Sequence, residues 1–357
     1  MHHRPLRHSA FSPPSVSFHG NYRSDILSPA SMSNDSKSFR ASRPSQINRR
    51  KFFHYAAAAV SLTSVPRLLE PVEAPEIAFT FDDPTTDGSG NLNWNERNER
   101  ILATLASYKI KSVLFVCGKR VDSGPGHQLI SIWDRQGHLI GNHSYSHLFF
   151  NENDKVTLAE FEADAVRNES LIRNYDHFTR LFRYPFFKEG DTIEKRDGMR
   201  LFLQKRGYRI GRATIDASDW AISARLEKRV EEKPKADLGG YRDFFLAHIW
   251  ERAQFYDSLA QRVLSRPVRH TVLLHHNPLN ALFVGDLIAM FVKNGWKPID
   301  ADYAYKDSVY ERQPKILPAG ESLIWALAKE TGYFERELRY PGEDDVYENP
   351  RMDAQNL

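Results

Sequence analysis

The feature that most constrains the fold is an alternation of short apolar runs with longer helical stretches, which begins at Glu76. A short apolar run bounded by turn residues is typical of a buried strand, and apolar residues at helical spacing indicate a helix packed on it. The expected strands are residues 77–81, 112–116, 138–141, 181–182, 208–210 and 271–274, and the expected helices are residues 95–108, 128–136, 157–175 and 280–294. This alternation predicts an α/β fold: a parallel sheet with crossover helices, either open or closed into a barrel.

The length of 357 residues allows one domain with a full core, or at most two. There is no internal repeat. We expect a leader over residues 1–74, a main domain over residues 75–305 with a helical insertion at about 224–269, and a C-terminal extension. This extension, residues 306–357, is expected to pack on or beside the domain.

The N-terminal region has the composition of an export leader. Residues 1–48 are rich in Ser, Pro, Arg and His, which is typical of disorder. A basic run that includes Arg49 and Arg50 then precedes the small and apolar residues 55–65, and this order resembles a twin-arginine translocation signal. The apolar run is too short for a stable membrane anchor. An ordinary basic tail followed by an amphipathic helix remains open.

Two details of the leader bear on its processing. Residues 72–74 offer a small-x-small cleavage site, and Met32 is an alternative start. We expect a periplasmic or extracellular protein with no stable membrane anchor after processing.

Charge and cysteine content exclude some classes of function. Residues 1–74 hold ten Lys and Arg against four Asp and Glu, so the total of +3 becomes about −3 for the rest of the chain. Without a basic footprint on the main domain, nucleic acid is a poor candidate partner. The single cysteine, Cys117, rules out an intrachain disulfide and lies in an apolar run, which predicts a packed core residue.

The first polar cluster at an expected strand end is Asp82 with Asp83. A parallel barrel builds its active site where its strands end. Two adjacent carboxylates can diverge there, so that one holds a metal while the other handles a proton. The alternative is plain turn chemistry, since Asp-Asp-Pro favours a turn.

The second cluster contains His143 and His147. Two imidazoles four residues apart converge if the segment turns helically, as a zinc or similar divalent site requires. An isolated pair would favour ordinary surface or core histidines. With a carboxylate from another strand end, the set becomes two histidines and one carboxylate, which leaves coordination positions open for water and substrate.

The third group is a scatter of charged and aromatic side chains: Arg183, Asp216, Trp220, and the adjacent pair His275 and His276. Each alone has a structural explanation, because arginines form ion pairs, tryptophans pack and histidines cap strands. Their order along the chain is more informative.

Five motifs, in order between about residues 76 and 296, resemble the polysaccharide deacetylases with NodB homology, carbohydrate esterase family 4. The motifs are Thr80-Phe81-Asp82-Asp83, His143-x-x-x-His147, Arg183-x-Pro185-Phe186, Asp216-x-x-Asp219-Trp220 and Leu273-x-His275. The resemblance implies a distorted, incomplete (β/α) barrel and a divalent metal, usually Zn²⁺, held by one aspartate and two histidines. It also implies a hydrolase that removes N-acetyl groups from N-acetylglucosamine units by metal-activated water.

The resemblance assigns roles residue by residue. It makes Asp83, His143 and His147 the metal ligands. It makes Asp82 the general base, with Arg183 orienting it and holding it ionised, and it makes His275 the general acid, with Asp216 tuning it. On the substrate side it places the backbone N–H near Phe186 at the oxyanion, Trp220 and Leu273 as apolar walls around the acetyl methyl, and Tyr145 among the substrate contacts.

Two positions depart from the family pattern. Pro84 stands where the family usually has glycine, and Phe186 stands where it usually has tyrosine. Neither is a metal ligand, so the reaction is better supported than the identity of the substrate.

Several alternatives stay open. The substrate could be peptidoglycan, a chitin-like oligomer or an exopolysaccharide, and the same fold could act on O-acetyl xylan or a small non-sugar amide. A secreted carbohydrate-binding protein with an inactive site is a reading of another class, against which the intact ligand set argues. In the last strand, Leu273 and His275 share one face, and we expect His275 rather than His276 in the pocket. The oligomeric state is open.

Overall fold

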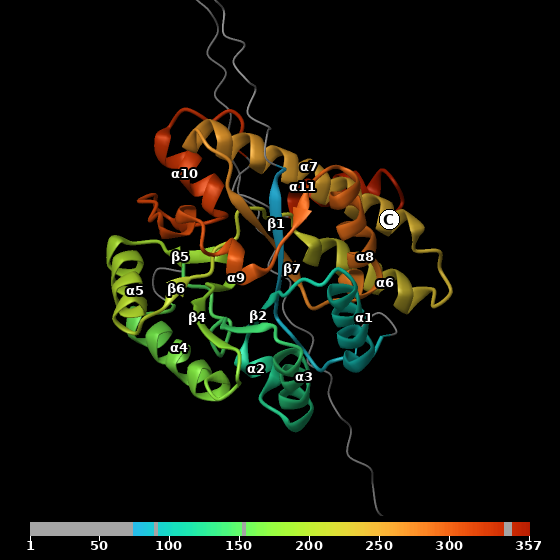
Figure 1. Ribbon diagram of the computed structural model, residues 1–357, viewed down its shortest axis with the longest axis horizontal. Coiled ribbons are helices and arrows are strands. Elements are labelled where there is room, and N and C mark those ends of the chain that lie inside the picture. The colour runs from blue at the N-terminus through green and yellow to red at the C-terminus, as the bar shows by residue number, and fades with distance from the viewer. Residues whose placement is uncertain (1–73, 89–91, 152–154, 339–344) are drawn as a thin grey trace, which may run out of the picture. The chain divides into compact units, whose positions relative to one another are not determined.

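The computed structural model describes residues 74–88, 92–151, 155–338 and 345–357, which lie within one compact unit. Its central sheet is parallel, with the strand order β6-β4-β3-β2-β1-β7 (Figure 1). The strands are β1 (Glu76–Asp82), β2 (Val113–Val116), β3 (Leu139–Asn142), β4 (Phe178–Phe182), β6 (Arg209–Ile210) and β7 (Arg269–His275), and β8 (Lys297–Pro298) pairs with the start of β1. All of these strands except β8 lie where the alternation predicted them, because the residues of β1, β2, β3 and β7 are at least partly buried and most are apolar.

One segment borders both edges of the sheet. It begins as β6 beside β4, where the N–H of Gly211 donates to the carbonyl of Phe182 at 2.7 Å. It ends at Ile215, which bridges in parallel to Val272 of β7. The sheet therefore curls round so that its two edges are joined by only a few residues. The expected distorted, incomplete barrel is confirmed.

The helices mostly lie where their caps and apolar spacing place them. Helices α1 (Trp94–Ser107) and α4 (Leu158–Ile172) each begin with a capping box, formed by Asn93 with Glu96 and by Thr157 with Glu160. The other helices are α2 (Gly118–Val121), α3 (Gly124–Arg135), α5 (Ile193–Lys205), α6 (Asp219–Glu232), α7 (Gly239–Leu264), α8 (Pro278–Lys293), α9 (Ala301–Ala304), α10 (Leu323–Thr331) and α11 (Asp345–Asp353), with 3₁₀ turns at Pro185–Phe187 and Ser308–Glu311. None of the helices in the described part of the chain is long and apolar enough to cross a membrane.

Helix α5 escaped prediction for a physical reason. It buries Lys195 and Arg196 together with Met199 and Leu203, so its inner face is partly charged and gives a weak apolar pattern. The segment 224–269, expected as an insertion, holds most of α6 and all of α7. These two helices form the connection from Ile215 to β7.

The C-terminal residues take part in the core. Tyr305 and Tyr310 are buried, and the hydroxyl of Tyr310 donates to the carbonyl of Arg269 at 2.9 Å. Helix α10 buries six of its residues, and the short strands β5 (Lys188–Gly190) and β9 (Ala319–Gly320) pair antiparallel. The tail therefore contributes buried side chains rather than only covering the outside. The expected leader, apart from Ala74, lies outside the described residues.

Candidate metal and catalytic site

Polar side chains stand at or just after the carboxyl ends of four strands of the central sheet. Asp82 ends β1, His143 follows β3, Arg183 follows β4 and His275 ends β7. Because all these strands are parallel, their carboxyl ends meet at the same edge of the sheet. Three of these side chains, Asp82, His143 and His275, line a cavity of about 1430 Å³.

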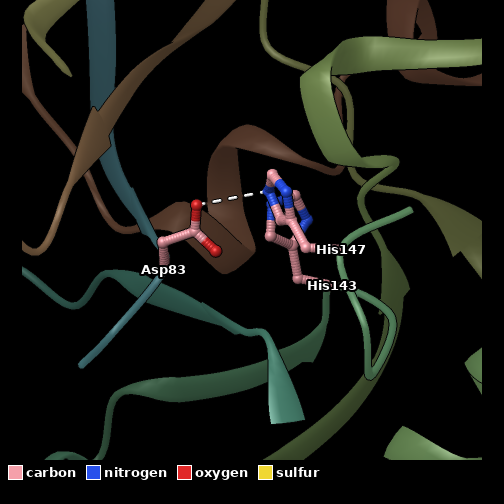
Figure 2. Close-up of side chains that lie close together, drawn as sticks. All are labelled: Asp83, His143 and His147. Carbon is pink, nitrogen blue, oxygen red and sulfur yellow. Dashed lines mark ion pairs between the residues drawn. The ribbon is translucent and has the colours of Figure 1, made fainter. Parts of the chain in front are cut away.

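Asp83, His143 and His147 form a group suited to a metal ion. Each offers one ligand atom, and these atoms all lie within 4.8 Å of one another. Figure 2 shows the Asp83 carboxylate facing the two imidazole rings, with Nε2 of His147 lying 3.2 Å from Oδ2 of Asp83. Two imidazoles and one carboxylate are a donor set that zinc and similar divalent ions accept, with further positions left for water and substrate.

The protonation states of this group fit ligation. Nδ1 of His143 lies 2.9 Å from the carbonyl of Arg183, so the ring donates there and keeps Nε2 available for a cation. Burial lowers the pKa of His143 to about 3, which leaves the ring neutral. Burial alone would raise the pKa of Asp83, but the hydrogen bond from His147 and the nearby charges hold it well below its usual range.

The loop that brings the histidines together is not the expected helical turn. His147 has a φ of 56°, in the left-handed region, and the residues between the histidines are not helical. Instead of helical carbonyls, the Asp164 carboxylate on α4 accepts the N–H groups of Tyr145 and Ser146 at 2.9 and 2.8 Å. A side chain from another helix therefore fixes the separation of the two imidazoles.

Asp82 is held by a buried arginine. Nη1 of Arg183 lies 2.7 Å from Oδ1 of Asp82 and 3.0 Å from Oγ1 of Thr80. The same guanidinium donates to the carbonyl of Gly211 and to the hydroxyl of Tyr305. These four contacts fix the carboxylate in one orientation.

The net effect on the pKa of Asp82 differs from expectation. We expected Arg183 to lower this pKa and keep the carboxylate ionised. Burial outweighs the arginine and raises the pKa of Asp82 to about 6. The carboxylate is thus a stronger base than an exposed aspartate.

His275 is paired with Asp219 rather than with the expected Asp216. Nδ1 of His275 lies 2.7 Å from Oδ1 of Asp219, and the backbone N–H of His275 donates to Oδ2 at 2.9 Å. Burial disfavours the charged ring, but the Asp219 carboxylate outweighs it and raises the pKa of His275 to about 9. Asp216 lines the cavity. The assignment of the tuning carboxylate is therefore corrected.

The strand register separates the two adjacent histidines. The His276 side chain is buried, and its ring centroid lies 6.4 Å from that of Trp133 in the core. Its backbone N–H donates to the carbonyl of Asp82 at 2.9 Å. His275 is thus the one whose ring meets Asp219 at the cavity, while the buried His276, which also borders the cavity, has its ring beside Trp133.

The expected substrate contacts are divided. Phe186, Trp220 and Leu273 line the cavity, and the first two are 53% and 45% exposed. Tyr145 does not line it, and this expectation is wrong. Its hydroxyl donates to Asp122 at 2.8 Å, its ring packs beneath the guanidinium of Arg167, and its backbone N–H donates to Asp164.

Sequence reasoning missed two contributions to the site. Nε of Arg120, on α2 directly after β2, lies 3.2 Å from Oδ1 of Asp83, and its position at a strand end was the available signal. The cavity is also lined by residues 315–318 of the C-terminal segment. No local pattern in that segment pointed to a site.

Comparison with known proteins supports one family. Residues 70–202 match the family model described as polysaccharide deacetylase. A peptidoglycan-N-acetylglucosamine deacetylase of Bacillus cereus is 27% identical over 151 residues, which cover 42% of this chain and 48% of that protein. The chain thus matches about half the length of this curated relative.

Several solved structures also align with part of this chain. A pseudoenzyme of carbohydrate esterase family 4 from Bacillus anthracis aligns with 16% identity and a TM-score of 0.46, covering 65% of each chain. A peptidoglycan deacetylase from Bacillus subtilis aligns with 20% identity and a TM-score of 0.41, covering 65% of this chain and 91% of that one.

Proposed function

Residues 70–202 belong to the polysaccharide deacetylase family, and from this premise we propose that the protein is a metal-dependent hydrolase that removes N-acetyl groups from an amino-sugar polysaccharide. The observation that carries the proposal is the convergence of a metal-binding group, a base and an acid in one cavity. Asp83, His143 and His147 form the metal-binding group, Asp82 is the base, and His275 is the acid.

The metal ligands would be Asp83, His143 and His147. When bound, a divalent ion, with Zn²⁺ as our first choice, supplies Lewis-acid activation of the amide carbonyl and of water. Asp82, oriented by Arg183, accepts the proton that the attacking water gives up. The backbone N–H of Phe186 would donate to the developing oxyanion.

His275 would deliver a proton to the leaving nitrogen. Its Nδ1 is taken by Asp219, which leaves Nε2 to exchange a proton with substrate. With a pKa of about 9, the ring is protonated at neutral pH and can act as an acid when the carbon–nitrogen bond breaks. The amine is a poor leaving group without this proton.

The cavity favours a glycan over a small amide. Its volume of about 1430 Å³ exceeds the roughly 300–1,000 Å³ of sites for drug-sized ligands. Three exposed aromatic side chains, Phe149, Phe186 and Trp220, line it and offer flat apolar surfaces against which sugar rings can stack. The curated relative is named for peptidoglycan N-acetylglucosamine, and we propose the same class of acetylated glycan here.

The decisive test is acetate release by the purified, metal-loaded protein from N-acetyl chitooligosaccharides and from peptidoglycan, with acetylated xylan as the competing substrate. We expect release from the first two and none in an Asp82→Asn variant. Acetate release from xylan alone would mean that the protein hydrolyses O-acetyl esters rather than N-acetyl amides. A protein that binds sugars but no metal would be a carbohydrate-binding protein.

We also propose that the mature protein acts outside the cytoplasm and is exported by the twin-arginine route. Residues 49–65 support this proposal through their basic-then-apolar order. A glycan of the cell wall or envelope would be accessible there.

A further inference from the structure

One wall of the catalytic cavity comes from the C-terminal segment, well beyond residues 70–202 that match the family. Lys315, Ile316 and Leu317 line the cavity together with Trp325 of α10. They face the same space as Asp82 and His275. A substrate bound at the catalytic residues therefore shares its cavity with this segment.

Three arginines hold this wall in place. Arg200 donates to the carbonyl of Pro314 at 2.9 Å, and Arg196 donates to that of Lys315 at 2.6 Å. Arg212 donates to the carbonyl of Arg312 at 3.0 Å. Backbone carbonyls bonded by buried or half-buried guanidiniums have few alternative positions, so the wall is already shaped before substrate binds.

The wall is also tied to the loop that carries Phe186. The N–H of Glu321 donates to the carbonyl of Phe187 at 3.1 Å, and Lys188 forms an ion pair with Glu321. Glu189, in the same loop, accepts hydrogen bonds from Arg200 and Arg212. The wall and the expected oxyanion loop thus form one connected unit.

The wall presents apolar surface to solvent inside the cavity. Leu317 is 44% exposed, and on the same cavity lie Phe149, Phe186 and Trp220, which are 38%, 53% and 45% exposed. Exposed apolar side chains grouped in one concave site mark a ligand surface, because leaving them in water is unfavourable. The apolar faces of sugar rings fit such a surface.

We propose that Lys315, Ile316 and Leu317 bind the sugar units next to the one that loses its acetyl group, and so make the enzyme selective for oligosaccharides over a single N-acetylglucosamine. This inference rests on the proposed deacetylase function. Leu317 contacts a neighbouring ring, and Lys315 offers its ammonium to hydroxyl groups. The volume of about 1430 Å³ leaves room for more than one ring.

The test compares Leu317→Ala with wild type on a single N-acetylglucosamine and on chitin trisaccharide and pentasaccharide. Loss of the apolar contact should raise KM for the oligosaccharides about five- to tenfold, with kcat nearly unchanged. The value of kcat/KM for the single sugar should stay within about twofold. Leu317→Met, which keeps the apolar contact, should resemble wild type. Leu201→Ala, on the exposed face of α5 and outside the cavity, is the matched control.

Binding measured by calorimetry in an Asp82→Asn background separates the two levels of the proposal. Weaker oligosaccharide binding in Leu317→Ala supports the proposal that the wall binds the neighbouring sugar units. Unchanged binding and kinetics in Leu317→Ala, or an equal loss on every substrate, overturns it while the deacetylase function stands. If no acetylated sugar binds or is hydrolysed, the proposed function fails and the wall assignment fails with it.

Discussion

Oδ1 of Asp219 lies 2.7 Å from Nδ1 of His275, and Oδ2 of the same carboxylate accepts the backbone N–H of His275 at 2.9 Å. Asp219 is fully buried and also accepts hydrogen bonds from Asn277 and Asn280. The neutral imidazole is therefore held in one tautomer and one orientation. Its protonated form is stabilised by the Asp219 carboxylate, which is itself held by hydrogen bonds from the His275 backbone, Asn277 and Asn280.

Asp219→Asn should reduce kcat by about 10²- to 10⁴-fold, because the ring loses both its tautomer and its charge partner. Without the carboxylate the pKa of His275 falls, so the alkaline limb of the kcat profile should move to lower pH. Asp216→Asn is the matched control. An equal effect in both variants would mean that Asp219 is not the specific partner.

The same pair makes a prediction for stability after metal removal. The pKa of His275 is raised from its ordinary 6.5 to about 9. The stabilisation is therefore fully present below about pH 6.5 and is lost as pH rises through about 9. The difference in unfolding free energy between wild type and Asp219→Asn, measured by urea unfolding, should shrink over that range.

His275→Ala and His276→Ala should fail in different ways. His275→Ala should lose about 10²- to 10⁴-fold in kcat while it keeps metal content and stability. His276→Ala removes a ring packed near Trp133 and should lower stability by about 1–3 kcal/mol with much smaller effects on rate. A larger loss of rate in His276→Ala at full folding would contradict the register of β7.

Adjacent aspartates should separate turnover from metal binding. Asp82→Asn should abolish measurable turnover and keep one bound metal, since Arg183 holds Oδ1 of Asp82 at 2.7 Å, while Nε2 of His143 lies farther away, 3.7 Å from Oδ2. Asp83→Asn should weaken metal binding first. Metal content by atomic absorption, read beside acetate release, checks both. Loss of metal in Asp82→Asn would mean that Asp82 is the metal ligand and Asp83 is the general base.

Arg120→Ala should weaken metal binding about 10- to 100-fold, as expected when a group that orients a ligand is removed. Its Nε lies 3.2 Å from Oδ1 of Asp83 and holds that oxygen while Oδ2 faces His147. Competition with a chelating dye measures the affinity independently of turnover. Lys119→Ala, on the same short helix, should leave the affinity unchanged. An unchanged affinity in Arg120→Ala would remove this orienting role.

Replacing Arg49 and Arg50 with lysine should leave the protein in the cytoplasm. Twin-arginine export depends on both guanidinium side chains rather than on positive charge alone, so charge-preserving lysines isolate the signal. Fractionation of cells that express wild type and variant measures the outcome. Undisturbed export of the variant would exclude this route.

The strand ends and their polar residues could be predicted because the signals are local. Burial of β1 follows from five apolar or small residues in a row, and the direction of a parallel strand then places Asp82 and Asp83 at its carboxyl end. Alternation along β7 placed His275 and His276 on opposite faces. Apolar residues at helical spacing predicted α4 over 157–175, one residue before its observed start and three residues past its observed end.

Other assignments depended on where distant segments pack. Asp216 and Asp219 are three residues apart, and only the start of α6 at Asp219 decides which carboxylate meets β7. Asp164 controls the histidine loop from another helix, which no spacing between the histidines could reveal.

By itself, then, the sequence determined the parallel fold, the strand ends that carry polar side chains and the phase of the last strand, because each depends on periodicity within a few residues. The tertiary structure alone decided the pKa of Asp82, the partner of His275 and the second wall of the cavity. Burial and ion pairing are properties of packed neighbours. The bond from Arg183 to Tyr305 joins residues 122 positions apart, and the contact from Arg196 to Lys315 joins residues 119 apart. Residues so far apart in the sequence come into contact only when the complete core has formed.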